Sequence, residues 1–217
     1  MLDEELRDKK IAALSSLKSA DEARFKVVLD SLLRDWPEHI PLLLAHLKVL
    51  DDGPRTPERL DEVVKAADAI LAKIDGNQVA VFFALNKNAE MVDATEVADM
   101  DARRSAMLEA LNRKCLALAE KPASQEQADQ FKEAYGQLER WVETSDAKYL
   151  KARVKYERQK ERPATALRLL QKALADSTDR ALFQLRRELL MELGWAMWDQ
   201  YDAVWNLIRF PHQYARF

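Results

Sequence analysis

Apolar side chains recur at every third or fourth position along almost the whole chain, with charged side chains between them. The first clear stripe consists of Phe25, Val28, Leu29, Leu32, Leu33 and Trp36. This spacing places the apolar side chains on one face of an α-helix. The pattern therefore predicts a helix over residues 25–36 that Pro37 ends, and a second helix over residues 42–50 that Pro41 opens.

Helix-breaking residues separate the later stripes. Asp51-Asp52-Gly53-Pro54 is such a break, after which Thr56 and Pro57 open a new helix. The apolar positions of this helix are Leu60, Val63, Val64, Ala67, Leu71 and Ile74. A short apolar segment over residues 79–85 comes next, and then a long helix over residues 95–119. The long helix has Leu108, Leu111, Cys115 and Leu118 on one face.

Capping patterns mark two further helix starts. Ser19 with Glu22, and Ser124 with Gln127, have the spacing of a capping box, in which each side chain bonds to the other residue's backbone N–H. The second box opens a helix whose apolar positions are Ala128, Phe131, Tyr135, Leu138 and Val142. Further helices are predicted at about residues 146–161, 163–175, 179–193 and 195–208.

Helices of one to two dozen residues joined by short polar turns are typical of antiparallel helical hairpins. The chain has only four glycines, too few for the many tight turns of a sandwich or barrel. We therefore expect an all-α fold, a tetratricopeptide-like α-solenoid, forming one repeat-like domain over residues 1–217 with a possible subdivision near residues 121–124. Ala166, Leu170 and Ala173 fit the second helix of that repeat, whereas its Trp and Gly-Tyr positions are not matched.

Charge and composition limit the possible partners and cellular compartments of the protein. The net charge is −3 and the sequence pI about 5.8, which argues against nucleic acid as a partner. A single cysteine, Cys115, rules out an intrachain disulfide and favours a reducing, cytoplasmic compartment. The acidic start of the chain does not resemble a signal peptide, and no apolar run predicts a membrane span.

Few residues in the sequence are candidates for a catalytic or metal-binding site. His39 and His46 are seven positions apart, but Pro41 intervenes and no further ligand stands at metal spacing. Cys115 lies in an apolar stripe, where a small core side chain is the better interpretation than a reactive thiolate. Neither a nucleophile motif nor a glycine-rich phosphate loop occurs. We expect no catalytic, cofactor-binding or metal-binding residues in this chain.

A basic stripe runs along the helix predicted at residues 146–161. Its members are Lys148, Lys151, Lys155, Arg158 and Arg162. One interpretation is a solvated helix face whose charge is relieved by Glu157 and Glu161. The other is a face that docks on an acidic protein surface. Nucleic acid ranks third because no aromatic residues alternate with the cations.

Aromatic residues concentrate in the segment 195–217. They are Trp195, Trp198, Tyr201, Trp205, Phe210, Tyr214 and Phe217, seven of the 17 aromatic residues in the chain. Each can bury roughly 150–250 Å², so the segment holds much potential burial energy. Two interpretations stand side by side: a capping helix that closes the open end of a repeat array, and an interface with another subunit or domain.

Three stretches of the sequence carry a family resemblance. The first is Leu193-Gly194-Trp195 with Tyr201, Trp205, Ile208, Phe210-Pro211, Tyr214 and Phe217. The second is Leu60-Asp61-Glu62-Val63-Val64 with Ala66-Ala67, Ile74-Asp75 and Ala80-Val81. The third is Asp99-Met100-Asp101 with Ala110-Leu111, Arg113-Lys114 and Ala117-Leu118-Ala119. In their order along the chain, these three stretches resemble the C-terminal region of the tripeptidyl-peptidase II family. Trp198, Arg209 and the short linker at residues 121–127 depart from that family's pattern.

The resemblance implies that the parent is a large cytosolic subtilisin-like serine exopeptidase, which removes tripeptides from the N-termini of oligopeptides. It also implies that the catalytic triad lies in an N-terminal part of such a protein, so no triad residue falls on this chain. The C-terminal region of the family is a tetratricopeptide-like helical domain associated with assembly of a very large homo-oligomer.

The leading hypothesis is therefore a non-catalytic assembly domain whose partners are other subunits or domains of the same enzyme, and not nucleic acid or membrane. The alternative is a helical-repeat adaptor that binds a peptide or protein, motivated by the basic stripe. An independent enzyme ranks third.

Overall fold

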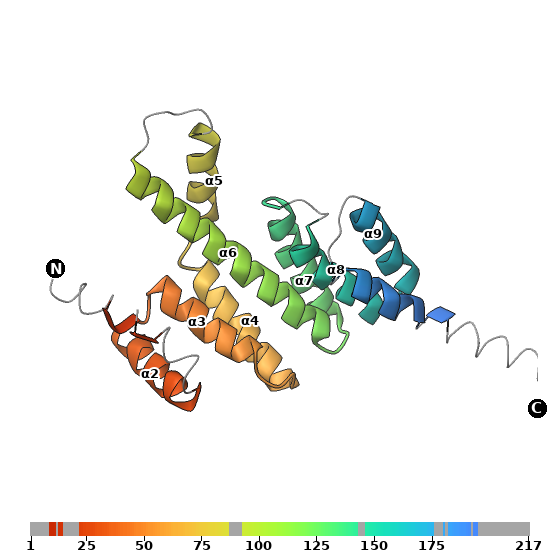
Figure 1. Cartoon of the computed structure of the whole chain (residues 1–217), viewed down its shortest axis with the longest axis horizontal. Coiled ribbons are helices and arrows are strands. Elements are labelled where there is room, and N and C mark those ends of the chain that lie inside the picture. The colour runs from red at the N-terminus through yellow and green to blue at the C-terminus, as the bar shows by residue number, and fades with distance from the viewer. Residues whose placement is uncertain are drawn as a thin grey trace, which may run out of the picture. The chain divides into compact units, whose positions relative to one another are not determined.

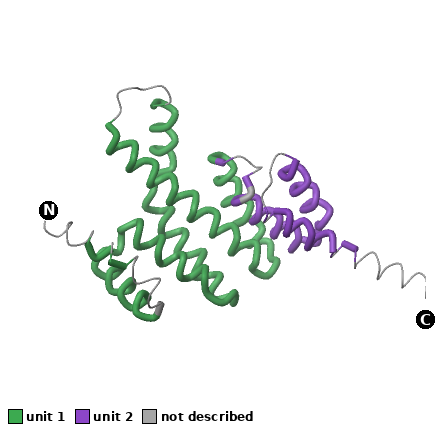
Figure 2. The backbone as a smooth tube through the Cα atoms, in the orientation of Figure 1, with its two compact units in different colours: residues 1–141 green, residues 142–217 purple. Residues whose placement is uncertain are grey.

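The computed structural model describes residues 9–11, 13–14, 22–86, 93–142, 146–175, 180, 182–191 and 193–194. All regular secondary structure within these residues is helical, which confirms the all-α prediction. A repeat of the tetratricopeptide type stays a prediction. The chain divides into two compact units, residues 1–141 and residues 142–217 (Figure 2). Each unit is described by itself.

Unit 1 is organised around one long helix, α6. Its helices are α2 (Glu22–Asp35), α3 (Ile40–Asp51), α4 (Pro57–Leu71), α5 (Gly76–Leu85), α6 (Ala94–Glu120) and α7 (Gln125–Glu139). Helices α3, α4, α5 and α7 all pack against α6, and α2 packs against α3 (Figure 1). Residues 121–124, where a subdivision was hypothesised, form the short turn between α6 and α7. The observed division lies one helix later, between Trp141 and Val142.

Two of the predicted helix caps are present. The Thr56 hydroxyl accepts a hydrogen bond from the Arg59 backbone N–H at 3.3 Å, and Pro57 occupies the first turn. The Ser124 hydroxyl accepts one from the Gln127 backbone N–H at 3.0 Å. The Gln127 side chain does not return to Ser124, however; its amide donates to the Leu118 carbonyl. Gln127 is buried between α6 and α7, so it satisfies the end of α6 instead of completing a capping box. The other predicted box rests on Ser19, which lies outside the described residues.

The buried stripe that begins on α4 differs from the prediction at three positions. The side chains of Leu60, Val63, Ala67, Ile70 and Ile74 are buried, whereas Val64 and Leu71 are half-buried. The buried positions alternate spacings of three and four, which is the repeat of a helix that packs along another helix. Ile70 therefore replaces Leu71 because α4 lies alongside α3 and α6.

Unit 2 contains α8 (Ala147–Gln159), α9 (Pro163–Ala175) and a further helical segment at residues 182–191. Helices α8 and α9 pack against each other. Their shared core consists of Leu150, Val154, Ala166, Leu170, Ala173, Leu182, Leu185 and Leu189. Ala166, Leu170 and Ala173, which the sequence analysis placed on one helix, are thus all core residues. The helix predicted at residues 195–208 lies outside the described residues.

The turn between α8 and α9 is a Schellman motif that closes without glycine. The Arg162 N–H donates to the Glu157 carbonyl at 2.9 Å, and the Glu161 N–H donates to the Arg158 carbonyl at 3.0 Å. Between them Glu161 adopts a φ of 56°, a left-handed conformation that a residue with a Cβ enters at a cost. Pro163 then opens α9, so the reversal of the chain is confined to three residues.

We expect Glu161→Gly to raise the free energy of unfolding of unit 2 by about 1 kcal/mol, because glycine adopts the left-handed conformation without strain. Urea denaturation followed by circular dichroism measures the change. Glu161→Ala is the matched control, since it removes the same carboxylate but keeps the Cβ. A glycine variant no more stable than the alanine variant would contradict the strain at this position.

Candidate interaction surfaces

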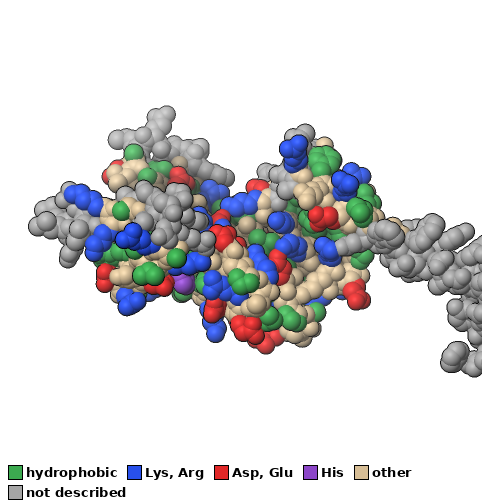
Figure 3. All heavy atoms as spheres, turned by 60° about the horizontal axis from the view of Figure 1, so that its bottom comes forward, with side chains coloured by type: hydrophobic (Ala, Val, Ile, Leu, Met, Phe, Trp, Pro, Cys, Tyr) green, Lys and Arg blue, Asp and Glu red, His purple; other side chains and the backbone are tan. Residues whose placement is uncertain are grey.

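Charge is distributed unevenly between the two units. Residues 1–141 contain 20 Lys and Arg against 27 Asp and Glu, a net charge of −7. Residues 142–217 contain 14 against 10, a net charge of +4, and the two values give the −3 of the whole chain. Basic and acidic side chains nevertheless lie close together on the face shown in Figure 3. The small net charge of the whole chain is therefore the sum of an acidic unit and a basic unit.

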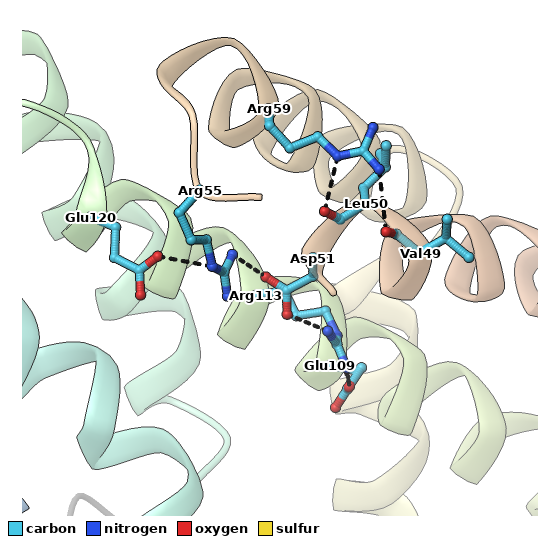
Figure 4. A network of polar contacts seen from close by, with 8 residues as sticks. All are labelled: Val49, Leu50, Asp51, Arg55, Arg59, Glu109, Arg113 and Glu120. Atoms are coloured by element: carbon cyan, nitrogen blue, oxygen red, sulfur yellow. Dashed lines mark hydrogen bonds and ion pairs between the residues drawn. The ribbon is translucent and has the colours of Figure 1, made fainter. Parts of the chain in front are cut away.

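A chain of ion pairs joins α3 to α6 in unit 1 (Figure 4). Asp51, at the end of α3, accepts hydrogen bonds from Arg55 at 2.7 Å and from Arg113 of α6. Arg113 also contacts Glu109 at 2.8 Å, and Arg55 contacts Glu120 at 3.2 Å. The side chains of Asp51 and Arg113 are only 10% and 17% exposed. Because every charge in this network faces one of opposite sign, we interpret it as a structural connection and not as a catalytic group.

Arg59 of α4 caps the end of α3 beside this network. Its Nε donates to the Leu50 carbonyl at 3.1 Å and its Nη2 to the Val49 carbonyl at 3.3 Å (Figure 4). A Cβ on Gly53 would lie 3.0 Å from Nε and 3.2 Å from Nη2 of the same guanidinium. A methyl group on Gly53 would therefore press on the Arg59 guanidinium, so glycine at this position leaves space for the cap.

The predicted basic face lies on α8 and the turn after it. The side chains of Lys148, Lys151, Arg158 and Arg162 are exposed, and Lys155 is half-buried. Three of the five cations, Lys151, Lys155 and Arg158, line one groove of about 310 Å³. The helical segment at residues 182–191 provides its other wall with Leu182, Gln184, Leu185 and Glu188. The sequence pattern placed the cations on one face, but it contained no signal for the second wall.

Glu157 does not relieve the charge of this face, contrary to the sequence interpretation. Its side chain is 3% exposed, and its carboxylate forms an ion pair with Arg153 at 2.9 Å. Arg153 lies four residues earlier on the same helix, so the pair closes within α8. Glu161 is exposed, but it occupies the left-handed turn after the helix. Glu157 thus pairs with Arg153 and not with the five cations of the basic face, and the docking role of this face stays a prediction.

Helix α5 is a surface that the sequence analysis described only as a short apolar segment. None of its ten residues is charged, yet Val81 is 56% and Leu85 is 75% exposed. Val79 is buried, and Phe83 lies under the Arg104 guanidinium with 5.1 Å between the guanidinium carbon and the ring centroid. A helix face that carries only apolar side chains is usually covered by a neighbouring element. Here α6 is the principal neighbour, so part of the apolar surface of α5 is left open.

The aromatic residues Trp195, Trp198, Tyr201, Trp205, Phe210, Tyr214 and Phe217 all lie outside the described residues. Their roles as cap or interface therefore stay predictions.

The histidines and the cysteine that were considered as site residues are half-buried or buried in unit 1. His39 and His46 are half-buried at the start and in the middle of α3. Cys115 is fully buried in α6, and burial raises the pKa of its thiol to about 12. Within the ranges that the structure describes, no three His, Cys, Asp or Glu side chains are grouped to hold a metal ion. Among the described helices, none is both long and apolar enough to cross a bilayer.

Comparison with known proteins identifies two relatives. Tripeptidyl-peptidase 2 of Oryza sativa subsp. japonica is 29% identical over 227 residues, and tripeptidyl-peptidase 2 of Arabidopsis thaliana is 29% identical over 232 residues. Each alignment covers 97% of this chain but 17% of the relative. The chain thus spans about a sixth of the length of these relatives, and the resemblance expected from the sequence is confirmed. No family model and no solved structure matches the chain.

We expect Gly53→Ala to lower the free energy of unfolding by about 1 kcal/mol, because its methyl group presses on the Arg59 guanidinium and weakens its hydrogen bonds to the carbonyls of α3. Gly136→Ala is the control. Gly136 lies inside α7, and beyond its chain neighbours and the nearby backbone of that helix no atom lies within 4 Å of the added Cβ, so the substitution should stabilise by about 0.5–1 kcal/mol. Urea denaturation of both variants measures the difference. Equal effects of the two substitutions would contradict the role of Gly53.

The pKa of Cys115 predicts a specific pH dependence. The thiol ionises near pH 9 when the chain is unfolded and near pH 12 when it is folded. The stability that this group contributes is complete below pH 9 and is lost above it, by up to about 1.4 kcal/mol per pH unit. Other groups titrate in this range too, so the measured quantity is the difference in unfolding free energy between the native chain and Cys115→Ala at pH 7.5, 9 and 10, with reductant present. A difference that stays constant with pH would contradict the burial of the thiol.

Proposed function

Because nearly the whole chain resembles part of tripeptidyl-peptidase 2, we propose that it is a non-catalytic helical domain of a tripeptidyl-peptidase II-like enzyme and that it holds subunits of that enzyme together. The parent would be a cytosolic serine peptidase that removes tripeptides from the N-termini of oligopeptides. Under this proposal the peptidase chemistry belongs to the remainder of the parent, since the chain corresponds to 17% of its relatives.

The observation that carries the assembly role is the open apolar face of α5. Val81 and Leu85 project from a helix that offers no charged side chain of its own. Burying one such side chain completely contributes roughly 1.5–3 kcal/mol, which favours covering them by another protein surface. A partner copy meets no like-charge repulsion along this helix. The exposed face is also close to a hollow of about 420 Å³ that Gly76, Ala80, Met107, Leu111 and Trp141 help to line.

A second candidate function is capture of a partner protein by a helical-repeat adaptor. The observation that favours it is the groove in unit 2, where cations of α8 face the segment 182–191. This surface and the α5 face lie on different units, so the two functions are compatible and can be tested separately.

We expect Val81→Lys to shift the chain from an oligomer to a monomer at micromolar concentration, because a charged side chain on α5 has to be desolvated in the contact. Light scattering on a size-exclusion column measures the mass over a wide concentration range. Val27→Lys is the matched control, since Val27 is 69% exposed on α2 and the substitution adds the same charge to the same unit.

A chain that ends at Gly194 separates the α5 face from the aromatic segment 195–217. If removal of the segment abolishes self-association while Val81→Lys has no effect, the contact belongs to the aromatic residues and not to α5. If Val27→Lys and Val81→Lys reduce the mass equally, added charge alone explains the change and the α5 face is not the contact.

A further inference from the structure

The outward face of α5 has the residue spacing of a coiled-coil seam. In the seven-residue repeat of coiled coils, positions a and d form the seam and positions e and g flank it. With Val81 at position a, the exposed residues of α5 fall on these four positions: Asn77, Gln78, Ala80, Val81, Ala84 and Leu85. Positions b, c and f hold the buried or half-buried residues: Gly76, Val79, Phe82 and Phe83. Helix α5 thus packs on α6 through one side and presents the seam on the other (Figure 1).

The seam of α5 carries no charge that would select a different partner. In coiled coils, charged side chains at positions e and g favour one partner and one orientation over others. Here position g is Ala80, and positions e are Gln78 and Leu85. A partner helix with charged flanks would have to desolvate them against uncharged side chains, which costs free energy. A second copy of α5 has no such cost, so the seam suits its own copy.

The side chains that flank the seam differ in size, and this difference depends on orientation when two copies pair. In a parallel pair, position g of one helix lies beside position e of the other, five residues later. Ala80 of each copy then lies beside Leu85 of the other, small against large on both sides. In an antiparallel pair, the large side chains of both copies lie on one side of the seam and the alanines on the other. Close packing therefore favours the parallel pair.

We propose that α5 pairs in parallel with α5 of a second copy across a two-fold axis, so that Val81 and Ala84 each contact the same residue of the other copy. The proposal rests on the assembly role proposed above and specifies its contact. A two-fold contact uses the same surface on both subunits and closes as a dimer. Because α5 has ten residues and is about 15 Å long, the contact is small and the dimer is in exchange with the monomer.

Single cysteines on the seam test which residues meet. Val81→Cys and Ala84→Cys should each form a disulfide-linked dimer when oxidised alone, because each residue faces its own copy in a parallel pair. The full chain is oxidised at a concentration where light scattering detects the dimer, and electrophoresis without reductant measures the linked fraction. Because Cys115 is buried, the native chain should form no linked dimer.

Val27→Cys is the matched control for these variants, since Val27 is 69% exposed on α2 of the same unit and the substitution is the same. Each seam variant should give at least about fivefold more linked dimer than this control, because only cysteines that meet in the contact are held at disulfide distance.

Exchange of the flanking side chains tests the size argument. Ala80→Leu brings two leucines together and Leu85→Ala leaves a space, so either change alone should weaken the dimer several-fold in light scattering. The double variant again has one small and one large side chain on each side of the seam, so it should recover most of the lost affinity. The helical circular dichroism signal checks that all three variants are folded.

Linked dimers that form only when Val81→Cys and Ala84→Cys are mixed would overturn the proposal, because they indicate an antiparallel pair. Linkage no greater than that of Val27→Cys, or a double variant no tighter than the single variants, would also overturn it. If Val81→Lys still produces a monomer in those cases, α5 holds subunits in another arrangement and the assembly proposal stands. A native chain that is a monomer at every concentration would overturn both proposals.

Discussion

The C-terminal half of α6 is buried on more than one face, and the packing of unit 1 depends on this. Cys115, Ala117, Leu118 and Ala119 are all buried although neighbouring residues of a helix point in different directions. Small side chains at three of these positions let neighbouring helices approach the backbone closely, and α3, α4 and α7 all pack against α6. A core enclosed in this way cannot take a larger side chain without moving a helix. The ion pair between Asp51 and Arg113 joins α3 to the same helix.

Much of the fold could be predicted because its signals are local. Thr56, Pro57 and Ser124 cap or open helices through their own backbone neighbourhood, and the structure places them as the sequence indicates. The features that could not be predicted depend on neighbours distant in sequence. Ile70 is buried instead of Leu71 because α4 lies along other helices, and Gln127 bonds to the end of α6 because α7 returns against it.

The candidate surfaces, too, could be predicted from the sequence only where one helix alone determines them. A row of cations on one helix could be predicted from the sequence, but the second wall of the groove belongs to residues 182–191 and could be identified only from the fold. Helix α5 had a readable signal, ten residues without a charge, yet an apolar helix is more often core than surface. Its exposure follows from the number of neighbours that α5 has, which a single sequence does not contain. The two surfaces differ in chemistry, one uncharged in an acidic unit and one basic in a basic unit, so they suit different partners.

Because Cys115 is buried, chemical modification of its thiol marks the molecules in which unit 1 has opened. It is the only thiol in the sequence, and it lies in α6, with α3, α4 and α7 packed around that helix. An oxidant or alkylating reagent reaches it only in molecules whose helices have separated, and a modified thiol no longer fits the space that it left. Each modified chain is therefore one that has opened and is prevented from closing again. Under oxidative conditions the lifetime of unit 1 is thus set by the rate at which α6 is uncovered if the reagent acts faster than the helices close, and by the equilibrium population of the opened chain if they close faster.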